Sequence, residues 1–91
     1  MSPWKPITTE AALGVNTGAA SNVGSSRYVR LLNTAAVGTE HLVTLEQSGG
    51  TDIGTFSLEG QQEVIIQKDP SDQLFAANAA VMAVGIAINS N

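Results

Sequence analysis

The last part of the chain follows a strict two-residue alternation, and this feature constrains the fold more than any other. Large apolar residues alternate with Ala and Gly, in the order Met82, Ala83, Val84, Gly85, Ile86, Ala87, Ile88. Successive side chains point to opposite faces of a β-strand, whereas an amphipathic helix repeats every three to four residues. The alternation therefore disfavours the competing interpretation, a single Ala-rich helix over residues 74–88. We expect a final strand with a bulky face that fills a core and a small-residue face that another backbone can approach.

Earlier segments show the same period, and turn-forming residues separate them. The segments that we expect to be strands are residues 27–33, 41–47, 53–58 and 63–68. In the first of these, Val29 and Leu31 share one face, while Tyr28, Arg30 and Leu32 share the other. The Gly-rich stretch that starts at Ser48 and the turn at Gly60 separate the later strands.

Three further segments are less regular. Residues 13–15 and 20–23 are expected to form two short strands joined by an Asn-Thr-Gly turn, with a short helix over residues 9–13 as an alternative. Asp69 precedes Pro70 in the pattern of a helix N-cap followed by proline, so one helical turn is expected over residues 70–76.

These elements predict an all-β protein, a small antiparallel β-sandwich or flattened barrel of about six to eight short strands. With 91 residues the chain supports one domain, which we place at residues 11–91. An extended N-terminal arm, residues 1–10, precedes it, because Pro3 and Pro6 oppose helix there.

Composition excludes several classes of function. Cysteine is absent and His41 is the single histidine, so disulfides, thiolate metal sites and histidine clusters are excluded. The net charge is −4 and the four cations are scattered, which argues against nucleic-acid binding. The first ten residues lack the apolar stretch of a secretory signal, and residues 74–88 are too short to span a membrane. We expect a soluble protein that binds neither nucleic acid nor membrane.

No catalytic or cofactor motif is recognisable. A nucleophilic triad would have to use His41, which begins an alternating strand next to Glu40 and is expected to be solvated. Asp69 and Asp72 have the spacing of turn ligands for calcium, but capping of the turn explains them without a metal. We therefore expect no enzyme, no cofactor and no metal.

Two groups of residues are candidates for contact with a partner protein. In the arm, Trp4 lies between two prolines, and tryptophan is favoured at the centres of interfaces. Trp4, Pro6 and Ile7 are the candidate anchors there, although Trp4 can equally fold back onto its own domain. On the first clear strand, Arg27 and Arg30 flank Tyr28; the alternative interpretation is that these charges guard an edge strand.

Three stretches of the chain resemble a known class of proteins. The opening SPWKPITT, the strand RYVRLLNTA and the closing KDPSDQLFAANAAVMAVGIAI are similar to small virion structural proteins of tailed phages, especially phages of marine bacteria and cyanobacteria. In that class a short arm leads to an arginine-bearing strand, and a K-x-P-[ST]-D-x-[IL]-F-A stretch precedes an Ala/Val-rich last strand. The resemblance covers nearly the whole chain.

The resemblance implies a capsid decoration, or cement, protein that binds the outer shell and stabilises the joints between capsomers. Its partner would be the major capsid protein or another virion protein, and its location the virion, after synthesis in the host cytoplasm. The arm is expected to add a strand to an exposed sheet edge of the shell protein and to become ordered on binding. The small-residue face of the last strand favours a homo-oligomer, with a trimer as the preferred state. The alternatives are a tail- or fibre-associated protein that contacts the host surface and a regulatory protein outside the virion.

Overall fold

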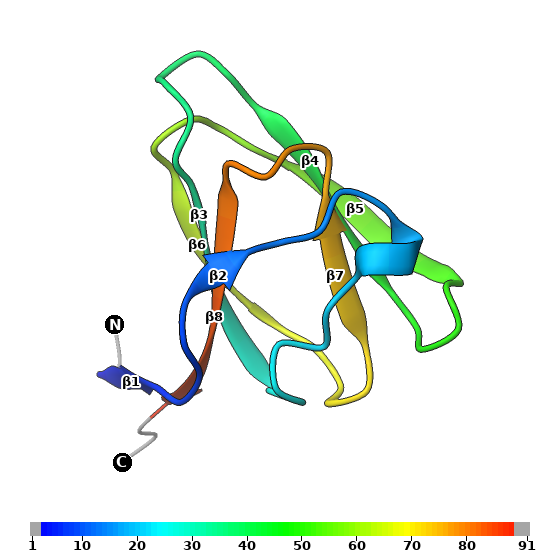
Figure 1. Ribbon diagram of the computed structural model, residues 1–91. Helices are drawn as coiled ribbons and strands as arrows, with labels where there is room; N and C mark the ends of the chain where they lie inside the picture. The colour runs from blue at the N-terminus through cyan, green and yellow to red at the C-terminus, as the bar shows by residue number, and fades with distance from the viewer. Residues whose placement is uncertain (1–2, 89–91) are drawn as a thin grey trace.

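The alternating segments form two antiparallel sheets in the computed structural model, which describes residues 3–88 (Figure 1). The strands are β1 (Trp4–Pro6), β2 (Ala11–Ala12), β3 (Tyr28–Asn33), β4 (His41–Glu46), β5 (Asp52–Leu58), β6 (Glu63–Gln67), β7 (Gln73–Ala76) and β8 (Val81–Ile88). Sheet A has five strands in the order β1-β8-β3-β6, with β2 also paired to β8. Sheet B has three strands in the order β5-β4-β7. The expected all-β sandwich is confirmed.

The N-terminal segment runs along one side of both sheets. In sheet A, β1 and β2 pair with β8, and the N–H of Leu13 donates to the carbonyl of Val81 at 2.9 Å. The chain then crosses to sheet B, where the carbonyl of Gly14 accepts from Ala76 and Ser21 forms a β-bridge with Leu74. Figure 1 shows this segment, in blue, passing from β2 towards β7. The edge strands on the opposite side of the sandwich are β6 and β5.

The core lies between the inward-facing side chains of the two sheets. Val29 and Leu31 of β3 face Val43 of β4 and Leu74 of β7, and all four side chains are fully buried. The remaining members of the core are Leu13, Val23, Leu58, Ala76, Val81 and Ala83. Phe56, Val64 and Ile66 pack against it from β5 and β6 but are only partly buried. The core is therefore less well covered on the side of the two edge strands.

Strand β8 turns its small-residue face inward, so the prediction that its bulky face fills the core is wrong. Val29 lies opposite Gly85 and Leu31 opposite Ala83, and opposite residues of paired strands share a face. At Gly85 a β-carbon would collide with the side-chain oxygen of Ser26 and lie 3.1 Å from the Thr8 methyl group. Val29, Leu31 and these neighbours fill the interior, and the residues of β8 opposite them are Gly85 and Ala83.

Two other local predictions are also wrong. Residues 13–15 and 20–23 are not strands; the 3₁₀ turn η1 (Thr17–Ala19) lies between them, and the Asn16 side chain caps it by accepting from the Ala19 amide. The helical alternative over residues 9–13 is replaced by β2. Asn and Ser side chains can bond to the nearby backbone, and Gly tolerates unusual backbone angles, so these residues favour tight turns over extended strands.

The segment after Asp69 forms a turn and then β7, not a helical turn. The amide of Asp72 donates to the Asp69 carbonyl at 3.0 Å, and the Asp72 carboxylate accepts from the Asp69 amide at 3.2 Å. Leu74 and Ala76 then alternate into the core while β7 pairs with β4. Tertiary pairing overrides the local capping signal. No helix within residues 3–88 has the length and hydropathy to cross a membrane.

We expect Gly85→Ala to lower the free energy of unfolding by about 1–3 kcal/mol, because the added methyl group overpacks the interior at Ser26. Gly54→Ala on β5 is the matched control, since a β-carbon there meets no atom within 4 Å. The control should be neutral or stabilised by up to about 1 kcal/mol. Urea denaturation of both variants measures the difference, and equal stabilities would contradict the inward orientation of Gly85.

Candidate partner-binding face

The side of sheet A that points away from sheet B carries an apolar surface, which we call the outer face. Strand register assigns to it Trp4 and Pro6 of β1, Ala12 of β2, Tyr28, Arg30 and Leu32 of β3, Ile65 of β6, and Met82, Val84, Ile86 and Ile88 of β8, with the polar residues Glu63 and Gln67 at the two ends of β6. Val84 and Ile86 are buried, yet neither belongs to the core between the sheets. The domain thus has two apolar layers, one inside the sandwich and one on the outside of sheet A.

Residues from distant parts of the chain meet on this face. Pro6 and Tyr28 lie on either side of Ile86, and Trp4 lies opposite Ile88 at the end of the sheet. Ile86 is 2% exposed as a result, while Trp4 and Tyr28 remain half-buried at the surface. The arm and the arginine-bearing strand, proposed separately as partner contacts, therefore supply one continuous surface.

An ion-pair network crosses the outer face. Arg30 donates through Nη1 to Glu10 at 2.9 Å and through Nε to Glu63 of β6. Glu10 precedes β2 on the far side of β8, so the two pairs connect β6, β3 and the N-terminal segment across Val84. The guanidinium charge is balanced by two carboxylates, which allows a cation to stand in an otherwise apolar surface.

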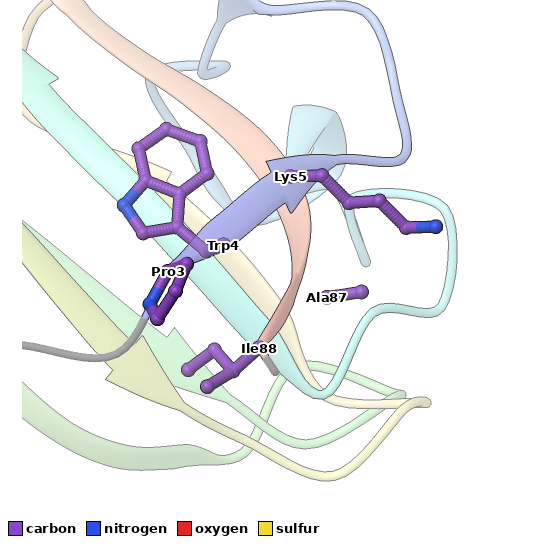
Figure 2. Close-up of a pocket in the computed structure, with 5 residues that line it drawn as sticks. All are labelled: Pro3, Trp4, Lys5, Ala87 and Ile88. Atoms are coloured by element: carbon purple, nitrogen blue, oxygen red, sulfur yellow. The ribbon is translucent and has the colours of Figure 1, made fainter. Parts of the chain in front are cut away.

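A shallow, open depression of about 350 Å³ lies at the end of the β1–β8 pair. Its lining is Pro3, Trp4, Lys5, Ala87 and Ile88. Figure 2 shows the side chains of Trp4 and Ile88 on one side of the strand pair and those of Lys5 and Ala87 on the other. Among the described residues of this lining Lys5 is the single ionisable one, and the others offer apolar contact.

Two predicted contact residues lie off the outer face. Ile7 is 54% exposed between β1 and β2, and its amide donates to the carbonyl of Gly85 at 2.8 Å. Arg27 is exposed just before β3, where its carbonyl accepts from the amide of Lys68. The interpretation that the two arginines guard an edge is wrong, because β3 lies between β8 and β6.

In the turn considered for calcium, the side chain of Lys68 is buried and bonds to the backbone. Lys68 is 5% exposed, and its ammonium donates to the carbonyls of Asp69 and Pro70 at 3.2 and 3.3 Å. Burial lowers the pKa of Lys68, and the charges of Asp72 and Asp69 partly oppose that shift. Within residues 3–88, groups of three or more His, Cys, Asp or Glu side chains that could hold a metal do not occur.

One buried charged residue was not anticipated from the sequence. Glu46 is fully buried at the end of β4, where it accepts hydrogen bonds from Gln73 at 2.7 Å and from Thr17 of η1 at 3.3 Å. These bonds fasten η1 to sheet B. Glu46 follows the polar positions of its strand, so the sequence carries no signal that distinguishes it from an exposed glutamate.

Comparison with protein-family models, curated proteins and solved structures finds no match to this chain. The function of the outer face is therefore argued from its own chemistry. It combines aromatic and aliphatic side chains with the ion-paired Arg30 and offers area for contact with a partner.

Removing the network on the outer face should measurably lower stability. In a double-mutant cycle of Arg30→Met and Glu10→Gln we expect a coupling energy of about 0.2–1 kcal/mol, because both groups are partly exposed. The coupling should shrink in about 1 M NaCl, where screening is strong. Arg27→Met is the control, since Arg27 forms no ion pair with the described residues, and its cycle with Glu10→Gln should give no coupling. Equal couplings in the two cycles would contradict the network.

The Glu40–Glu59 pair predicts a pH dependence. A side-chain hydrogen bond with Glu40, together with desolvation and repulsion, raises the pKa of Glu59 above its usual 4.5. The folded state then binds this proton more tightly than the unfolded state, so the stabilising contribution exists below the raised pKa and is lost as pH rises through it. We expect Glu59→Gln to gain stability over the parent at neutral pH, and the gain to disappear in acid.

Urea midpoints measured across this pH range test the expectation. Glu40→Gln should behave in the same way, and the double variant should add little to either single one, because each substitution removes the same repulsion. A gain that is constant with pH would show that the two carboxyls do not interact.

Proposed function

We propose that this chain is a virion structural protein of the capsid-decoration type, which binds the outer shell through its outer face and stabilises the joints between capsomers. The resemblance of the opening, arginine-bearing and closing segments to small phage virion proteins supports this assignment. The partner is the major capsid protein or another virion protein. The role is non-catalytic.

The observation that carries the proposal is the apolar second surface of sheet A. A domain of 91 residues gains little from leaving Trp4, Tyr28 and several aliphatic side chains half-buried outside its core. Contiguous apolar surface on a small domain marks an interaction site, and tryptophan, tyrosine and arginine are the residues enriched at interface centres. All three occur on this face, with Arg30 already neutralised by Glu10 and Glu63.

The position of the arm changes the way in which we propose that it contributes. Residues 4–6 pair with β8 of their own sheet, so Trp4 stands in a preformed surface. A preformed anchor loses less conformational entropy on binding than an arm that becomes ordered. Docking through sheet A therefore replaces addition of the arm to a sheet edge of the shell protein.

Copy number supplies the strength that a single small contact lacks. A shell presents many identical sites, and modest contacts at neighbouring sites act together when one molecule or one oligomer touches several capsomers. Such contacts would add stabilisation across the joints between capsomers.

Substitution of the aromatic anchor tests the proposal. Trp4→Ala should weaken binding to purified shells of the cognate phage by about 30-fold or more, as expected for a central tryptophan. Val37→Ala is the matched control, because Val37 is 83% exposed in the loop between β3 and β4 and lies outside the outer face. Cosedimentation with shells measures both.

Two results would overturn the proposal. One is undiminished shell binding by Trp4→Ala with its fold intact. The other is cryo-EM density that places the protein on the tail or fibre, or finds it absent from the particle.

A further inference from the structure

Strand β6 (Glu63–Gln67) is an open edge of sheet A. It pairs with β3 along its whole length without a register shift, and nothing within residues 3–88 pairs with its other side. Natural sheets protect such edges with proline, lysine, bulges or covering segments. β6 has no proline, lysine or bulge in its sequence EVIIQ, and its one charged side chain, Glu63, stands at its first position, whereas the opposite edge of sheet A holds Pro6 and is interrupted between β1 and β2.

The register fixes which backbone groups of β6 point to solvent. The amide of Lys68 donates to Arg27 and the amide of Asn33 donates to Gln62, so these are the hydrogen-bonded pairs at the two ends of the ladder. Hydrogen-bonded and non-hydrogen-bonded pairs alternate along antiparallel strands. Val64 and Ile66 therefore bond to β3. The backbone groups of Glu63, Ile65 and Gln67 point away from it, towards the open edge.

We propose that this edge pairs with β6 of a second copy of the chain, antiparallel and about a two-fold axis at Ile65. In that register Ile65 faces Ile65 of the second copy, and Glu63 faces Gln67 of the second copy. All three outward-pointing residues of each copy then form hydrogen-bonded pairs. A shift of two residues in either direction loses one of these pairs, so the edge is most complementary to itself in the centred register.

The charges favour the same register. Glu63 faces the neutral amide of Gln67, which can donate to its carboxylate. Sliding the strands two residues in one direction would instead place Glu63 opposite Asp69, and a register centred on Glu63 would place two glutamates together. Like charges directly opposite each other destabilise a sheet pair.

Pairing would also cover apolar groups that the single domain leaves open. Val64 and Ile66 pack against the core but remain half-exposed at this side of the sandwich. In the centred register Val64 lies next to Ile66 of the second copy, on the inward side of the joined sheet. On the other side, Ile65 connects the two outer faces into one surface.

This pairing replaces the reason for self-association inferred from the sequence. The small-residue face of β8, which favoured a trimer, is buried inside the sandwich and cannot contact another copy. Pairing of two β6 strands about a two-fold axis gives a dimer. The inference is independent of the proposed role on a shell.

Substitutions at Gln67 test the register, because opposite charges introduced there should change the strength of the dimer in opposite directions. Gln67→Glu places two like charges opposite each other at both ends of the pairing and should weaken the dimer by about two- to thirty-fold. Gln67→Lys places a cation opposite Glu63 and should strengthen the dimer by about the same factor. Thr55→Glu and Thr55→Lys are matched controls on the other open edge, β5, and should leave association unchanged. Sedimentation equilibrium of the full chain over a concentration series measures all five proteins.

Amide hydrogen exchange gives a second readout that does not depend on substitutions. The amides of Glu63, Ile65 and Gln67 should become protected as protein concentration rises, while those of Val64 and Ile66 are protected at every concentration. A chain that stays monomeric, a trimer, or a dimer whose strength ignores the charge at position 67 would overturn the proposal.

Discussion

The pairing of β8 with β3 is the interaction on which the rest of the structure depends. It places Gly85 opposite Val29 and Ala83 opposite Leu31. At Gly85 the core has no room for a β-carbon. Met82, Val84, Ile86 and Ile88 are thereby directed to the other side of sheet A, and Val81 at the start of the strand is the one large apolar residue of β8 that faces the core. β8 also holds β1 and β2 on its free side, which means that the same pairing places the N-terminal segment.

The outer face is a direct consequence of this arrangement. Ile86 and Val84 would be exposed on a bare sheet, but Pro6, Tyr28 and the ion pairs of Arg30 surround them. The apolar surface is consequently ordered by main-chain pairing and not by contacts among flexible side chains. A surface of this kind can dock with little loss of conformational entropy.

The sequence predicts the five longest strands, β3, β4, β5, β6 and β8, because their alternation is local information. The alternation of Met82, Val84 and Ile86 identifies β8 without knowledge of any partner, and the β-branched run at residues 63–67 identifies β6. Which face of β8 points to the core cannot be read from the strand's own residues. Bulky residues normally mark the buried face, and only the presence of Ser26 and Thr8 beside Gly85 shows that the interior accepts the small face. The helical turn predicted over residues 70–76, with Asp69 as its N-cap, is wrong for a similar reason, because pairing with β4 holds Leu74 and Ala76 in an extended conformation. Trp4, Tyr28 and Arg30 could be identified as candidate contact residues from their residue types. That they lie on one face depends on the order of the strands in the sheet, which local sequence patterns do not reveal.

The central place of β8 has a consequence for how the protein is made. The strand lies at the C-terminal end of the described residues, yet β1, β2 and β3 all pair with it, so sheet A cannot assemble until residue 88 has left the ribosome. Closing contacts between residues so distant in sequence is slow, because the loop entropy must be lost before the contacts form. Folding of sheet A therefore waits until all of its strands have been synthesised. Until it occurs, the apolar strands of the nascent chain, β6 among them, are open to pairing with other chains.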